Sequence, residues 1–91
     1  MQYDDKVALS KVRLETAKEC LRDSRILLES DSFKSSANRS YYAVFHAMRA
    51  VLVFDEFDSK KHSGIISEFR KRYIKTGIGS PGSFFLFQIQ R

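Results

Sequence analysis

The sequence predicts an all-α protein, an antiparallel helical bundle of three main helices followed by an irregular C-terminal tail. Its 91 residues form one domain, and a chain of this size buries only about 60% of the surface that its unfolded chain exposes. With 43% hydrophobic and 30% charged residues, one proline and four glycines, the composition is that of a folded globular chain. Apolar residues also recur at steps of three and four, the spacing of amphipathic helices.

The first predicted helix covers about residues 5–29. One face carries an apolar stripe, with charged side chains on the opposite face. The stripe contains Leu14, Ala17, Leu21, Ser24 and Leu28. The polar run SDSFKSSAN that follows predicts a loop and the start of the next helix.

The second and third helices are predicted at about residues 35–54 and 60–75, with Gly77 as the C-terminal cap of the third. A Glu68/Arg72 pair at i,i+4 is expected to be exposed. Residues 1–77 therefore form the helical domain, and residues 78–91 form an apolar tail broken by glycine and proline. The side chains expected to be buried together are Leu14, Leu21, Leu28, Tyr41, Phe45, Met48, Leu52, Ile66 and Phe69.

The second helix has two faces to bury. The core-facing stripe is predicted to be Ala37, Tyr41, Val44, Phe45, Met48, Val51 and Leu52. Arg39 and His46 lie opposite, within about 20° of each other and roughly 10 Å apart along the axis. Ala43 and Ala50 share that face, and such small residues let another helix come close. We therefore expect a homodimer through this helix, which would bring two copies of Arg39 and His46 together.

The net charge of +5 is concentrated in one segment, because residues 60–75 hold six basic side chains and one acidic side chain. The basic residues are Lys60, Lys61, Arg70, Lys71, Arg72 and Lys75. They form a candidate RNA-binding surface, since neutralising backbone phosphates needs no reading of sequence. A solvated helix face explains the same charges equally well.

The single cysteine, Cys20, excludes an internal disulfide and a cysteine-based zinc site, and indicates a reducing compartment. A cytoplasmic location is expected. The N-terminus lacks the basic region of a signal peptide, and no apolar stretch approaches the ~20 residues that span a bilayer. No metal or cofactor is expected, since the sequence lacks an HExxH motif and a Gly-rich phosphate loop.

The segments NRSYYAVFHAMRAVL (residues 38–52) and KKHSGIISEFRKRYIKTG (residues 60–77) resemble the HEPN family. That resemblance implies a helical bundle that forms dimers. It also implies a motif on the second main helix, in which four to six residues separate an Arg from the His that follows it. Arg39 and His46, with six residues between them, fit this motif. In active members the pair cleaves RNA without metal, and the family is often paired with a nucleotidyltransferase as toxin and antitoxin.

Cleavage of RNA needs a base for the 2′-hydroxyl proton, an acid for the leaving 5′-oxygen and a cation for the phosphorane. His46 can serve as base or acid, and Arg39 can bind phosphate oxygens. Asn38, Ser40 and Tyr42 are candidate orienting residues. The alternative is a non-catalytic HEPN module that binds a nucleotidyltransferase partner or a nucleotide. For His62, at the start of the third helix, a structural role such as a cap is preferred.

Overall fold

The computed structural model describes residues 1–75, so the predicted tail and the predicted cap at Gly77 lie outside the described residues. Three helices follow in order, α1 (Tyr3–Glu29), α2 (Phe33–Leu52) and α3 (His62–Phe69). A 3-10 turn, η1 (Val53–Asp55), follows α2 directly, and a π-helical segment, η2 (Arg70–Lys75), continues α3. Residues 1–75 contain no strand, and the predicted all-α bundle is confirmed.

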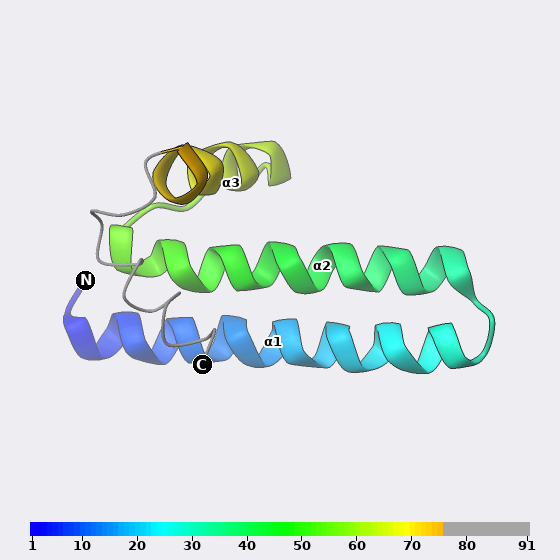
Figure 1. Cartoon of the computed structure of the whole chain (residues 1–91). Helices are drawn as coiled ribbons and strands as arrows, with labels where there is room; N and C mark the ends of the chain where they lie inside the picture. Colours follow the sequence, from blue (N-terminus) through cyan, green and yellow to red (C-terminus); the bar gives the residue numbers. More distant parts are fainter. Residues whose placement is uncertain (76–91) are drawn as a thin grey trace.

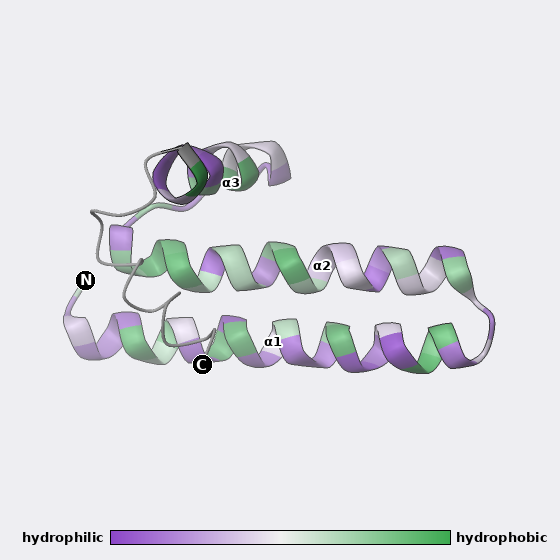
Figure 2. Ribbon diagram, in the orientation of Figure 1, coloured by the Kyte–Doolittle hydropathy of each residue, from purple (hydrophilic) through white to green (hydrophobic). Residues whose placement is uncertain are grey.

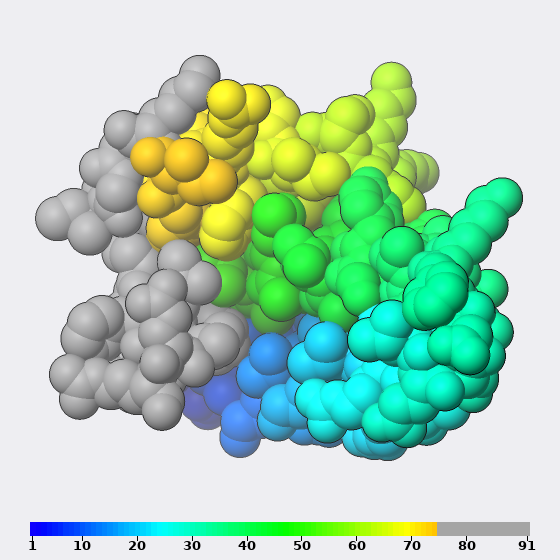
Figure 3. All heavy atoms as spheres, turned by 45° about the vertical axis from the view of Figure 1, so that its right-hand side comes forward, coloured from blue at the N-terminus to red at the C-terminus, as the bar shows by residue number. Residues whose placement is uncertain are grey.

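The helices are arranged with α2 in the middle. α1 and α2 run antiparallel along their whole lengths, and α3 lies on the other side of α2, near its C-terminal end (Figure 1). The space-filling view shows α3 directly against α2, with α1 below them (Figure 3). None of the helices within residues 1–75 combines the length and the apolar character that crossing a membrane requires.

The turn between α1 and α2 is closed by backbone hydrogen bonds. The Ser32 N–H donates to the Leu27 carbonyl at 2.8 Å, and the Asp31 N–H donates to the Leu28 carbonyl at 3.1 Å. Asp31 adopts a left-handed conformation with φ of 60°, which aspartate tolerates better than most side chains. This cap ends α1 and reverses the direction of the chain.

Small residues, most of them at seven-residue intervals, form the contact between α1 and α2, which we call the small-residue seam. Its buried members are Ser10, Ala17, Cys20 and Ser24 on α1 and Ser36, Ala43 and Ala50 on α2. The backbones approach closely enough for the Ser10 hydroxyl to donate to the Ala50 carbonyl at 2.9 Å. At the other end, the Ser36 hydroxyl donates to the Ser24 carbonyl at 2.7 Å. A seven-residue repeat keeps one seam between two helices over many turns.

The seam corrects two predictions. Ala43 and Ala50 do accept a close helix, but that helix is α1 of the same chain and not a second copy. Three members of the predicted core are exposed, namely Leu21 (50%), Leu28 (54%) and Tyr41 (44%), and so is Val44 (54%). The physical reason is that hydroxyl and methyl groups, and not the larger apolar side chains, occupy the α1–α2 contact.

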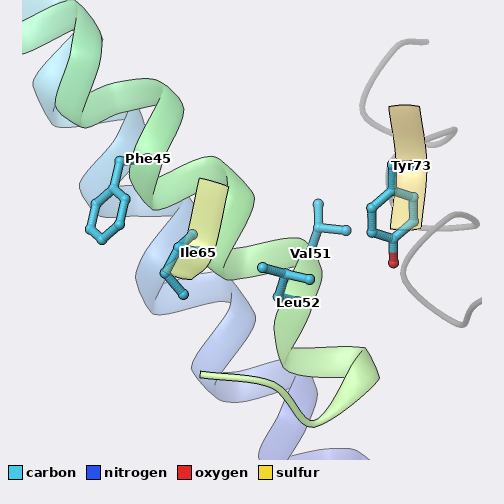
Figure 4. Close-up of a cluster of buried hydrophobic side chains, with 5 residues drawn as sticks. All are labelled: Phe45, Val51, Leu52, Ile65 and Tyr73. Atoms are coloured by element: carbon cyan, nitrogen blue, oxygen red, sulfur yellow. The ribbon is translucent and has the colours of Figure 1, made fainter. Parts of the chain in front are cut away.

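The larger apolar side chains gather on the other side of α2, against α3 and η2. This core contains Phe45, Val51, Leu52, Ile65 and Tyr73 (Figure 4). Leu52 and Ile65 are completely buried, while Met48 and Phe69 pack against the cluster and are partly buried. The hydropathy colouring shows apolar bands along the part of α2 that faces α3 (Figure 2). The predicted burial of Phe45 and Leu52 is thus confirmed, whereas Leu14 and Ile66 are only partly buried.

Candidate functional site

Arg39, Tyr42 and His46 form a row of side chains on α2, with Tyr42 between the two residues of the predicted motif. Arg39 and His46 are both half-buried. The Arg39 guanidinium carbon lies 5.5 Å from the centroid of the Tyr42 ring, within the range of a cation–π contact. The Tyr42 and His46 ring centroids are 6.3 Å apart and their planes differ by 30°. Tyr42 therefore bridges Arg39 and His46, as positions three and four apart on a helix can.

The first residue of α3 brings a second imidazole to this row. The His62 ring lies 4.2 Å from that of Phe45 and meets the Tyr42 ring edge-on at 5.5 Å. The His46 ring lies 5.4 Å from the same Phe45 ring. The two histidines therefore share two aromatic neighbours. The KKHSG turn was the sequence signal for His62, but the sequence alone did not place it beside His46.

The surroundings of His46 disfavour its charged form. Partial burial is the largest cause that lowers the pKa of His46, and the charges of Arg49, His62, Arg13 and Arg39 lower it further. The lowered pKa favours the neutral imidazole. A neutral imidazole can accept a proton, which is the requirement for a general base.

Two arginines hold one carboxylate beside the site. The Arg13 Nη2 donates to Asp58 Oδ2 at 3.0 Å, and the Arg49 Nη2 donates to the same oxygen at 3.1 Å. Partial burial alone would raise the pKa of Asp58, but the hydrogen bonds from Arg49 and from the Ser59 N–H, with the two arginine charges, lower it overall. Sequence reasoning missed this cluster. Its available signal was Arg49, three positions after His46 on the same helix.

The other predicted orienting residues lie away from His46. Asn38 is exposed and lines, with Arg39, a groove of about 530 Å³ toward the α1–α2 turn. The Ser40 hydroxyl contacts the Ser24 hydroxyl, so this side chain belongs to the small-residue seam. Of the three candidates, Tyr42 is the one in contact with both motif residues.

The predicted RNA-binding residues differ in their surroundings. Lys61, Arg70 and Lys71 are exposed, and Lys60 is exposed at the edge of a cavity next to His62. The Arg72 Nε donates to Glu68 Oε1 at 2.7 Å, so the predicted i,i+4 pair forms, although it is partly buried. The side chain of Lys75 lies outside what the structure describes. Among residues 1–75, no group of three or more His, Cys, Asp or Glu side chains could hold a metal ion.

Comparison with known proteins identifies the family. A model of the HEPN domain matches residues 10–86. The chain belongs to the HEPN family. The predicted resemblance is confirmed, and no solved structure matches the chain significantly.

Relatives of this HEPN chain include several bacterial and archaeal proteins. A UPF0332 protein of Thermotoga maritima is 39% identical over 61 residues, which are 67% of this chain and 46% of that protein. A Methanocaldococcus jannaschii protein named as a candidate toxin is 34% identical over 64 residues, 70% of this chain and 48% of that protein. A second protein of that organism with the same description is 36% identical over 63 residues, 69% of this chain and 43% of that protein. The chain spans about half the length of these relatives.

Proposed function

We propose that this HEPN protein is a metal-independent endoribonuclease in which His46 is the general base and Arg39 binds the reacting phosphate. The observation that carries the proposal is the environment of His46, which is half-buried among aromatic rings and arginines and whose pKa is lowered by burial and by the arginine charges. Arg39 lies one contact away through Tyr42. Membership of the HEPN family and the names of two relatives as candidate toxins agree with a toxin-like role.

The proposed reaction needs side chains only. His46 takes the proton of a ribose 2′-hydroxyl, and the 2′-oxygen bonds to the adjacent phosphorus. Arg39 stabilises the charge on the phosphorane oxygens. The bond from phosphorus to the 5′-oxygen breaks, and a protonated imidazole gives that oxygen its proton. The products are a 2′,3′-cyclic phosphate and a 5′-hydroxyl.

The proposal includes a homodimer, because one imidazole acts as base while a second acts as acid. Two copies of His46 and Arg39 meeting across α2 would supply both. The small-residue seam is already filled by α1, so the dimer contact must use the part of α2 that carries Arg39, Tyr42 and His46. In this scheme exposed basic residues such as Lys61 and Lys71 bind the RNA backbone, and a nucleotidyltransferase partner acts as the antitoxin.

The test is cleavage of an end-labelled RNA by purified protein in EDTA, with analysis of the product ends. We expect cyclic phosphate ends, and no cleavage of the same sequence made as DNA, because the 2′-hydroxyl is the nucleophile. His46→Ala and Arg39→Ala should each abolish cleavage with little loss of stability, since neither side chain is in the core. Arg25→Ala, which removes an exposed arginine from α1, is the matched control and should cleave normally.

Three results would contradict the proposal. Cleavage that survives His46→Ala would assign the activity to another site or to a contaminant. A monomer in sedimentation equilibrium at the assay concentration would remove the dimeric arrangement. Absence of cleavage by the wild-type protein would favour the alternative, a HEPN module that binds a partner and cuts nothing.

A further inference from the structure

A cavity of about 620 Å³ opens next to the candidate site, where α2, the segment after η1 and the first turn of α3 meet. Phe45 and His62 form part of its wall, and both are in ring contact with each other. Arg49 and Lys60 also line it. Because His46 contacts the Phe45 ring, the cavity lies beside the proposed base.

The cavity carries an excess of positive charge. Asp58 lines it, but its carboxylate already accepts hydrogen bonds from Arg13, Arg49 and the Ser59 N–H, the last at 2.8 Å. The positive charges of the Arg13 and Arg49 guanidinium groups therefore face the single negative charge of the Asp58 carboxylate. Lys60 adds a further positive charge at the rim. An anion in this cavity would be attracted by the net charge of its lining.

One hydrogen-bond donor of Arg49 has no acceptor among the described residues. Its Nη2 is used by Asp58, but its Nε is buried and has no hydrogen-bond partner among the described residues. An unsatisfied buried donor is costly and rare, so a small shift of the guanidinium that brings this donor to an acceptor in the cavity is favoured. A phosphate oxygen is the acceptor that guanidinium groups bind best.

The first turn of α3 adds a second source of attraction for an anion. No side-chain hydrogen bond caps the N-terminus of α3, which begins at His62, so the positive end of the helix dipole lies at the cavity wall that His62 forms. Gly64 keeps this turn close to Ser59, because a Cβ at Gly64 would lie 2.5 Å from the Ser59 Oγ. The segment that carries Ser59 and Lys60 is thereby held against α3.

We propose that this cavity binds a phosphate group, held by Arg49, Lys60 and His62 beside the imidazole of His46. The choice of RNA as the source rests on the proposed function, in which this phosphate neighbours the one that reacts. Free phosphate presents the same oxygens. The site is formed within one chain, so it does not require the proposed dimer.

The test is a titration of the protein with inorganic phosphate, following the His62 imidazole resonances by NMR at fixed pH and ionic strength. We expect a saturable shift, which chloride does not produce. Arg49→Gln should raise the Kd about tenfold, the cost of a lost hydrogen bond to a charged group. Lys60→Gln, at an exposed position that leaves the fold intact, should raise it at least about fivefold. The matched control is Lys11→Gln on the exposed side of α1, which should leave the Kd unchanged.

A second titration distinguishes the sources of phosphate. A 2′-O-methyl RNA oligonucleotide cannot be cleaved, and its competition with inorganic phosphate would assign the site to RNA. Failure to compete would assign it to free phosphate. The proposal is overturned if phosphate leaves the His62 resonances unchanged, or if the Arg49 and Lys60 variants bind it as the wild type does. Neither titration depends on cleavage, so a protein without ribonuclease activity would still give a decisive answer.

Discussion

At the scale of single residues, His46 shows how position on a helix decides chemistry. Its ring contacts the aromatic rings of Tyr42 and Phe45, and the neighbouring charges belong to arginines and to a second histidine. Burial beside these rings and the neighbouring positive charges both lower the pKa of the imidazole, because each disfavours its charged form. The lowered pKa therefore suits the role of base that is proposed for one copy of His46.

The lowered pKa of His46 predicts a dependence of stability on pH. Between the folded pKa and the ordinary value of about 6.5, the unfolded chain binds more protons than the folded protein. The free energy of unfolding therefore rises with pH through this window, and the stability is lost as pH falls through the folded pKa. We expect His46→Gln to lose less stability than the wild type when urea unfolding is compared at acid and neutral pH. An equal loss in both proteins would mean that His46 is not the group responsible.

The residue pair Arg39 and His46 could be predicted from the sequence because seven-residue spacing on one helix is a local property. The positions of Arg49, Asp58 and His62 around the pair could not. They depend on where the chain turns after η1 and on how α3 packs on α2, which are contacts between segments distant in sequence. The structural role predicted for His62 rested on the KKHSG turn alone.

At the scale of secondary structure elements, the pairing of α1 and α2 relies on small side chains. Ser10, Ala17 and Ser24 recur every seven residues on α1, and Ser36, Ala43 and Ala50 do the same on α2. The extents of both helices were predicted to within a few residues. The buried faces were predicted in part, because Ala17 and Ser24 of the predicted α1 stripe are buried while its larger members Leu21 and Leu28 are exposed.

The seam predicts that a larger side chain will be tolerated poorly there. Ala50 is completely buried against α1, so Ala50→Leu should destabilise the protein by about 1–3 kcal/mol through overpacking. Ala37→Leu introduces the same side chain on an exposed position of the same helix and should change stability by less than about 0.5 kcal/mol. Thermal unfolding of the two variants measures the difference. Equal melting temperatures would contradict the close contact between α1 and α2.

At the scale of the whole molecule, α2 is shared by two different contacts. Its small residues face α1, while Phe45 and Leu52 face α3. The motif residues Arg39 and His46 occupy the side of α2 that neither contact fills completely, which leaves both half-buried. The bundle thus supports the candidate site from two directions, and α3 adds His62 and the cavity beside it.

The most direct test of the central claim, that His46 is the base in RNA cleavage, is a comparison of two pH curves. The acid limb of kcat/KM for RNA cleavage should follow the titration of the His46 imidazole measured by NMR in the free protein. Because the pKa of His46 is lowered, that limb should fall below the ordinary imidazole value of about 6.5. Coincidence of the two curves is the result predicted here. A value of kcat/KM that falls with a different pKa, or that stays constant across the His46 titration, would contradict the assignment of His46 as the base.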